Sequence, residues 1–69
     1  MSREVLQEVL KGLYEAKSEA QLAQWNLYAM RDSPEYANVE GVYVLLTEIQ
    51  PRLQAAYEAI QEALHIPKG

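Results

Sequence analysis

Apolar residues recur along most of this chain at alternating steps of three and four, the spacing of a helix face that packs against other helices. The first such series is Leu6, Val9, Leu13, Ala16, Ala20, Ala23, Leu27 and Met30. The second is Val39, Val42, Leu46, Ile49, Leu53, Ala56, Ile60 and Ala63. The sequence therefore predicts an all-α fold, with these residues forming the core or dimer seam of two packed helices.

A polar stretch, Asp-Ser-Pro-Glu at 32–35, separates the two series. Ser33 suits a helix cap, and Pro34 suits the first helical position because its missing N–H would be unpaired there. We expect one domain, an antiparallel helical hairpin, since so short a turn leaves the helices side by side.

The expected boundaries follow from these signals. Helix one runs from about 3 to 31 after a cap at Ser2, the turn covers 32–33, helix two runs from about 34 to 65, and 66–69 form a short C-terminal tail. Asn38 and Gly41 weaken the first turns of helix two, so a fresh start at Asn38 is the alternative.

Pro51 lies inside the second series, where it removes a backbone hydrogen bond and crowds the preceding turn. Because the apolar series keeps its phase on both sides of Pro51, we expect one helix with a kink. The alternative is a third helix that is capped by Thr47 and carries Pro51 in its first turn.

The apolar face of helix two is wider than one partner helix covers. Residues beside the series are apolar too: Tyr43, Leu45, Tyr57, Ala59 and Leu64. With 69 residues and no cysteine, the chain has a small core and no disulfide to support it. We therefore expect a homodimer in which two hairpins form a four-helix bundle.

Charge and hydropathy indicate which environments suit the chain. Ten acidic and six basic residues give a net charge of −4, and the Lys and Arg residues are scattered, so no nucleic-acid partner is expected. The apolar runs are much shorter than a membrane span, so no membrane partner is expected either. The first residues lack a signal-peptide pattern, and the expected location is cytoplasmic.

One motif favours metal chemistry. Glu62 and His65 have the Glu-x-x-His spacing of carboxylate-bridged di-metal bundles, and Glu58 lies one turn earlier. The helical phase places Glu58 and His65 opposite the apolar series and Glu62 beside them, so all three face solvent at the end of the helix, which favours a solvated terminus over a buried site. We expect no metal site and no cofactor, and keep a metal-binding or ferritin-like oxidoreductase bundle as the alternative.

A second apolar stripe, formed by Leu22, Trp25 and Ala29, lies roughly opposite the first series. An indole beside leucine on an outer face suits an anchor for another protein. The alternative is that the dimer or the tail from Ile66 covers this stripe. We expect a heterologous protein partner to use it if one exists.

The sequence offers no catalytic constellation. It has one histidine, near its end, no glycine-rich phosphate loop, and no polar group in its predicted core whose pKa burial could perturb. The expected function is a non-enzymatic interaction or scaffold module that self-associates as a helical bundle. A small regulatory protein that docks on a larger partner is a further alternative.

Several short stretches resemble the small YaaL-type proteins of Gram-positive bacteria, an uncharacterised family of helical chains. The matching residues are Ala16-Lys17-Ser18-Glu19, Ala23, Asp32-Ser33-Pro34-Glu35, Val42-Tyr43 and Ile66. The chain departs from the family pattern at Ala20, where a tryptophan is usual, and at Pro51. The resemblance implies a small cytoplasmic helical protein and assigns no site residue.

Overall fold

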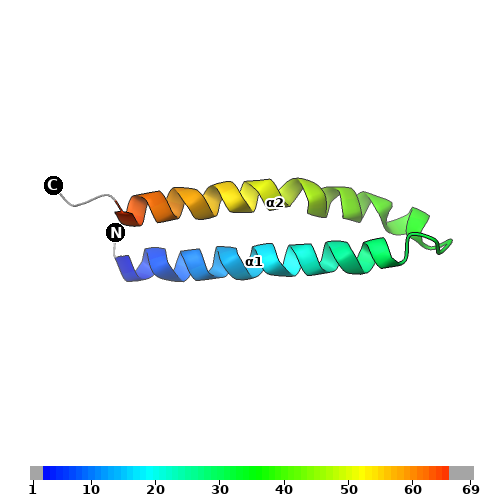
Figure 1. Cartoon of the computed structure of the whole chain (residues 1–69), viewed down its shortest axis with the longest axis horizontal. Coiled ribbons are helices and arrows are strands. Elements are labelled where there is room, and N and C mark those ends of the chain that lie inside the picture. Colours follow the sequence, from blue (N-terminus) through cyan, green and yellow to red (C-terminus); the bar gives the residue numbers. More distant parts are fainter. Residues whose placement is uncertain (1–2, 66–69) are drawn as a thin grey trace.

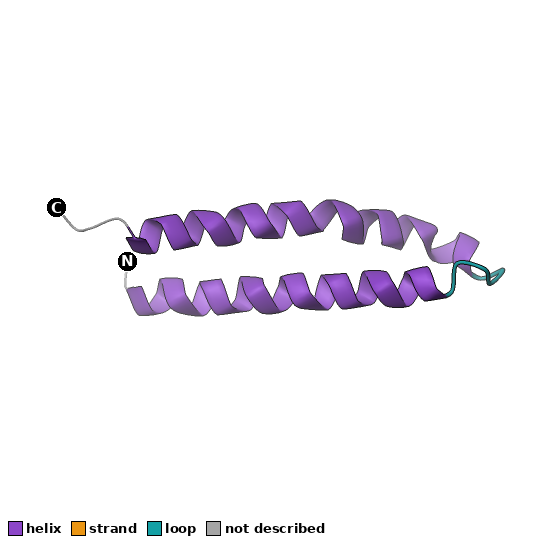
Figure 2. Cartoon of the chain, viewed as in Figure 1, coloured by secondary structure: helices purple, strands orange, loops and turns teal. Residues whose placement is uncertain are grey.

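A computed structural model, which describes residues 3–65, shows a hairpin of two long helices (Figure 1). Helix α1 spans Arg3–Ala29 and helix α2 spans Tyr36–His65. The helices run antiparallel along each other, joined by the single loop of Figure 2. The predicted all-α hairpin is thus confirmed, whereas the predicted cap at Ser2 and tail 66–69 lie outside the described residues.

The turn is longer than predicted and covers residues 30–35. Helix α1 ends before Met30, whose N–H donates to the carbonyl of Leu27 at 3.1 Å, three residues back. Such bonds tighten the end of a helix and prevent a further α-turn. Pro34 precedes α2, because the N–H of Tyr36 donates to the Ser33 carbonyl at 3.0 Å and closes the turn before the helix begins. Helix α2 therefore starts at Tyr36, neither at Pro34 nor at Asn38.

A side-chain hydrogen bond organises the turn. The hydroxyl of Ser33 donates to the carboxylate of Glu35. This bond, followed by a backbone bond at Glu35, lowers the pKa of that carboxyl below its ordinary value of 4.5. The ionised carboxylate therefore stabilises the folded turn above the ordinary pKa, and that contribution is lost as the pH falls through the lowered value.

Replacing Ser33 with alanine is expected to raise the pKa of Glu35 toward its ordinary value, because the donor is removed. A carboxyl-detected NMR titration of Glu35 measures the change. Ser18→Ala, an exposed position within α1, is the control and should leave the Glu35 titration unchanged. An unshifted Glu35 in the Ser33 variant would show that another group holds its charge.

Pro51 lies inside α2 without ending it. Figure 1 shows α2 as one uninterrupted ribbon that curves along its length. The expected continuous helix is therefore correct, and Thr47 does not cap a third helix. The Thr47 hydroxyl instead donates to the carbonyl of Tyr43, one turn earlier, at 3.0 Å. Gln50 likewise donates from its amide to the Leu46 carbonyl at 3.1 Å.

Two rows of residues on each helix form the contact between the helices, and every member of both rows is half-buried. The first, which we call the central row, consists of Leu6, Leu13, Ala20, Leu27, Val39, Leu46, Leu53 and Ile60. The second, which we call the mixed row, consists of Leu10, Lys17, Gln24, Tyr36, Tyr43, Gln50, Tyr57 and Leu64. Within each helix, members of a row are seven residues apart, so each row follows one line along the hairpin.

Polar side chains in the mixed row connect the helices. The ammonium group of Lys17 donates to the Gln54 side-chain carbonyl. The Gln24 amide donates to the Thr47 hydroxyl at 2.8 Å, and the Gln50 amide donates to the Gln24 carbonyl oxygen at 2.6 Å. These bonds satisfy polar groups that the helix contact would otherwise strip of water.

Aromatic pairs continue the same line and fix the register of the two helices. Ring centroids lie 6.4 Å apart for Tyr14 and Tyr57, and 6.0 Å apart for Tyr28 and Tyr43. In both pairs, and in the Lys17–Gln54 and Gln24–Thr47 bonds, the two residue numbers add to 71. Residues of α1 and α2 whose numbers add to 71 therefore lie at the same height along the hairpin.

The end of the hairpin beside the turn is closed by aromatic rings. Tyr36 packs edge-on against Tyr43 with centroids 6.4 Å apart, and the Arg31 guanidinium lies 4.4 Å above the ring of Tyr28. Loss of water around the Tyr36 hydroxyl raises the pKa of Tyr36, and the nearby negative charge of Glu40 raises it by a smaller amount. At the other end, Arg3 donates from Nη2 to the Leu64 carbonyl at 2.6 Å.

Candidate interaction surface

The hairpin has two long sides of opposite character. Because the helices are antiparallel, equivalent positions of both helices point to the same long side of the hairpin. Residues four positions after each mixed-row residue point to one side, and residues one position before it point to the other. The side after the mixed row is polar on α2, with Thr47, Gln54 and Gln61, and carries Tyr14 and Tyr28 on α1. We call it the polar side, and it holds the hydrogen bonds and aromatic pairs described above.

The opposite side, which we call the apolar side, begins with a row that contains no polar residue. This row, which we call the apolar row, consists of Val9, Ala16, Ala23, Met30, Val42, Ile49, Ala56 and Ala63. It lies beside the central row on both helices, so the two rows together form one continuous apolar face. Its larger members remain accessible in the hairpin: Val9 is 43% exposed, Val42 is 49% exposed and Ile49 is 44% exposed.

An outer edge borders the apolar side on each helix. Its residues are Val5, Gly12, Glu19, Asn26, Asn38, Leu45, Arg52 and Ala59, and all of them are exposed. Within this outer edge and the apolar row, only Glu19 and Arg52 are charged. Two shallow hollows lie along it, one near the start of α1 between Val5 and Val9, which Glu8 also lines, and one near the middle of α2 beside Ile49 and Arg52, which Glu48 also lines.

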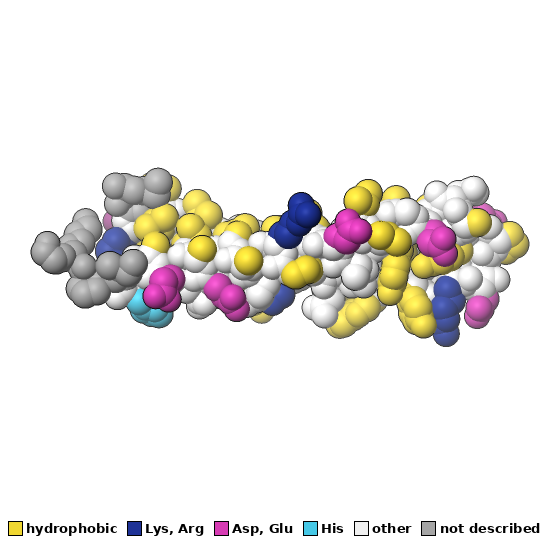
Figure 3. Space-filling model, turned by 90° about the horizontal axis from the view of Figure 1, so that it is seen from above, with side chains coloured by type: hydrophobic (Ala, Val, Ile, Leu, Met, Phe, Trp, Pro, Cys, Tyr) yellow, Lys and Arg dark blue, Asp and Glu magenta, His cyan; other side chains and the backbone are white. Residues whose placement is uncertain are grey.

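No side chain within residues 3–65 is fully buried in the hairpin. Even the leucines of the central row keep part of their surface in water, because each helix covers only one flank of the other. In Figure 3, hydrophobic side chains are visible along the length of the molecule between scattered charged ones. A stable monomeric domain normally buries several large side chains completely, and this hairpin does not.

The predicted seam residues divide between two places. The central row carries half of them and lies in the helix contact. The other half forms the apolar side, and of these only Ala23, Met30 and Ala56 are half-buried. The contact is completed by the mixed row, which the apolar spacing does not reveal because Lys17, Gln24 and Gln50 are polar.

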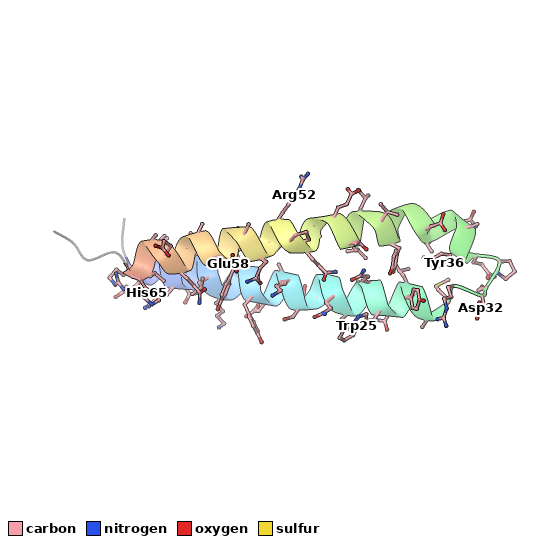
Figure 4. All side chains as sticks on the ribbon, turned by 45° about the horizontal axis from the view of Figure 1, so that its top comes forward. Trp25, Asp32, Tyr36, Arg52, Glu58 and His65 are labelled. Atoms are coloured by element: carbon pink, nitrogen blue, oxygen red, sulfur yellow. The ribbon has the colours of Figure 1, made fainter. Side chains whose placement is uncertain are left out.

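The second predicted stripe lies on the outside of α1. Trp25 is 59% exposed and Leu22 is 58% exposed, and Ala29 is exposed as well. Figure 4 shows Trp25 pointing away from α2. Tyr28, 49% exposed, extends this patch toward the turn, so its members lie on the opposite flank of α1 from the apolar side.

The residues of the metal alternative are exposed at the end of α2. Glu58 accepts a hydrogen bond from the amide of Gln54 at 2.9 Å. Within residues 3–65, no three His, Asp or Glu side chains come together as a group that could hold a metal ion, and this includes Glu58, Glu62 and His65.

Neither α1 nor α2, over the residues that the structure describes, combines the length and the apolar character needed to cross a membrane. No protein-family model, curated protein or solved structure matches the chain. The resemblance to the YaaL-type family therefore stays a prediction.

Proposed function

We propose that this chain is a non-enzymatic interaction module that works as a self-associated pair of hairpins, a four-helix bundle formed through the apolar side. The observation that carries the proposal is a continuous face without polar residues, formed by the central row and the apolar row, on a hairpin in which no described side chain is fully buried. Covering that face removes the central row and Val9, Val42 and Ile49 from water, with about 25 cal/mol gained for each Å² of apolar surface.

The placement of the polar residues supports this assembly. In a bundle centred on the central row and the apolar side, the mixed row lies at the rim. Lys17, Gln24 and Gln50 then keep their cross-helix hydrogen bonds and their access to water. Burial of the polar side instead would strip these groups of water without new partners. The apolar side is therefore the face that favours association.

The extent of the apolar side is adequate for a stable dimer. Helix α2 has 30 residues and is about 45 Å long, so a second hairpin can lie against the apolar side over most of its length. Dimer formation also supplies the core that a chain of 69 residues lacks on its own.

Sedimentation equilibrium at micromolar concentration tests the proposal. A dimer mass is expected, with helical circular dichroism that falls on dilution, because the fold and the association are coupled. A well-folded monomer at this concentration would contradict it. The proposal extends to a cytoplasmic location, which localisation of a tagged chain in its native cell tests.

A second candidate function is docking on a larger protein through the patch of Leu22, Trp25, Tyr28 and Ala29. The exposure of Trp25 favours it, because an indole that stays 59% accessible in the hairpin is available to fill a pocket on a partner. This patch lies away from the apolar side, so both surfaces can be occupied in the same assembly. A small regulatory protein would use it in this way.

Trp25→Ala is expected to leave the thermal midpoint almost unchanged and to weaken partner capture by ~2 kcal/mol or more, the effect of losing an aromatic hot spot. Wild-type fluorescence should be red-shifted and accessible to a soluble quencher. Blue-shifted, shielded emission, together with a stability loss of ~3 kcal/mol or more in the variant, would instead place Trp25 in a core.

A further inference from the structure

We propose that the second copy lies on the apolar side with its α2 against α1 of the first, so that Glu19 of each copy meets Arg52 of the other. This arrangement rests on the self-association proposed above and specifies its geometry. The two-fold axis runs along the bundle, every neighbouring pair of helices is antiparallel, and both turns lie at the same end.

Charge is the first argument for this arrangement. Glu19 and Arg52 are the only charged residues of the apolar row and the outer edge, and they have opposite signs. Both are exposed, and Figure 4 shows Arg52 projecting away from the hairpin. Two exposed, opposite charges at the border of an apolar face suit the rim of an interface with a complementary partner.

Height along the hairpin is the second argument. The residue numbers of Glu19 and Arg52 add to 71, and so do the residue numbers in each cross-helix pair that fixes the register. A two-fold axis parallel to the helices preserves height, so residues of α1 and of the other copy's α2 whose numbers add to 71 face each other. Each dimer therefore contains two contacts between Glu19 of one copy and Arg52 of the other.

The residues next to this pair allow the helices to approach. Gly12 of α1 lies at the height of Ala59 of α2, Ala16 lies within one residue of the height of Ala56, and all four are small. A Cβ atom added at Gly12 would meet nothing within 4 Å in the hairpin. A second copy placed as proposed fills this open space with small side chains from both helices, which brings the two backbones close.

The rival geometry turns the axis across the bundle, so that α1 packs on α1 and α2 on α2 of the other copy. In that case Glu19 and Arg52 lie on different helix pairs and do not meet each other. Arg52 of each copy then lies close to both Arg52 and Glu48 of the other, because these residues are near the middle of α2. This geometry therefore lacks the two Glu19–Arg52 contacts of the proposed one.

Thiol cross-linking tests the proposal, since the chain contains no cysteine. Glu19→Cys and Arg52→Cys chains are mixed as folded dimers, allowed to exchange and treated with a short bifunctional thiol reagent. The mixture should give several-fold more linked dimer than either chain alone. Efficient linking in Arg52→Cys alone, with no gain in the mixture, would overturn the arrangement while leaving the dimer intact.

Charge exchange provides an independent readout. Glu19→Lys and Arg52→Glu should each raise the dimer dissociation constant about tenfold, because each creates two like-charge contacts. The double variant should restore it to within about threefold of the wild-type value. Single variants with unchanged dissociation constants would overturn the proposed pairing, whereas a monomeric wild-type chain would overturn self-association itself.

Discussion

Leu53→Ala is expected to destabilise the protein by ~2 to 5 kcal/mol and to dissociate the dimer together with the fold. Leu53 belongs to the central row, where it is half-buried in the hairpin and faces the centre of the proposed bundle. Truncation is expected to leave a cavity between the helices of the bundle. Chemical denaturation at several protein concentrations measures the loss, and Leu46→Ala should behave in the same way.

Leu22→Ala is the matched control for this prediction. It removes the same side-chain atoms from a residue within an α-helix, but Leu22 is 58% exposed on the outside of α1. The change should cost less than about 1 kcal/mol. If Leu53→Ala proved equally mild, the central row would not be the core of the folded assembly.

Ile49→Lys is expected to weaken the dimer about a hundredfold or more, because each copy would bury an unpaired ammonium group in the interface. Val44→Lys is a sensitive control. Val44 and Ile49 are both β-branched, lie in α2 and are nearly equally exposed in the hairpin, at 46% and 44%. Val44, however, points away from the apolar side, so its replacement should leave the dissociation constant nearly unchanged.

Sedimentation equilibrium on both variants provides the measurement. Equal weakening by Ile49→Lys and Val44→Lys would indicate a general effect of added charge. Weakening by Val44→Lys alone would assign the interface to the other side of α2. Because the hairpin exposes both residues equally, only the presence of a second chain makes them behave differently.

The helical hairpin could be predicted because apolar spacing and punctuation agree. The two series keep phase over their whole length, and Pro34 stands between them, so the number of helices and their antiparallel order follow. The predicted turn is too short, since Met and Arg favour a helix and nothing in the sequence stops α1 before Met30 and Arg31. Their N–H groups instead bond three residues back, which only the folded turn reveals.

The contact between the helices could be predicted only in part. Apolar spacing correctly identifies the central row as part of the helix contact. It predicts that the residues of the apolar side complete this contact, whereas in the structure the mixed row completes it. Lys17 and Gln24 enter the contact because their methylene stems pack while their end groups bond across it. Tyrosines at matching heights, Tyr14 with Tyr57 and Tyr28 with Tyr43, were the available signal for this second row.

The constant register along the hairpin also has a consequence for the order in which the contacts form. Tyr28 and Tyr43, beside the turn, close a much shorter loop than Tyr14 and Tyr57 do. Loop-closure entropy grows with the logarithm of loop length, so the outer pair costs about 1 kcal/mol more if it forms first. We therefore expect the hairpin to close from the tyrosines at the turn and to proceed, pair by pair, toward the bond between Arg3 and Leu64.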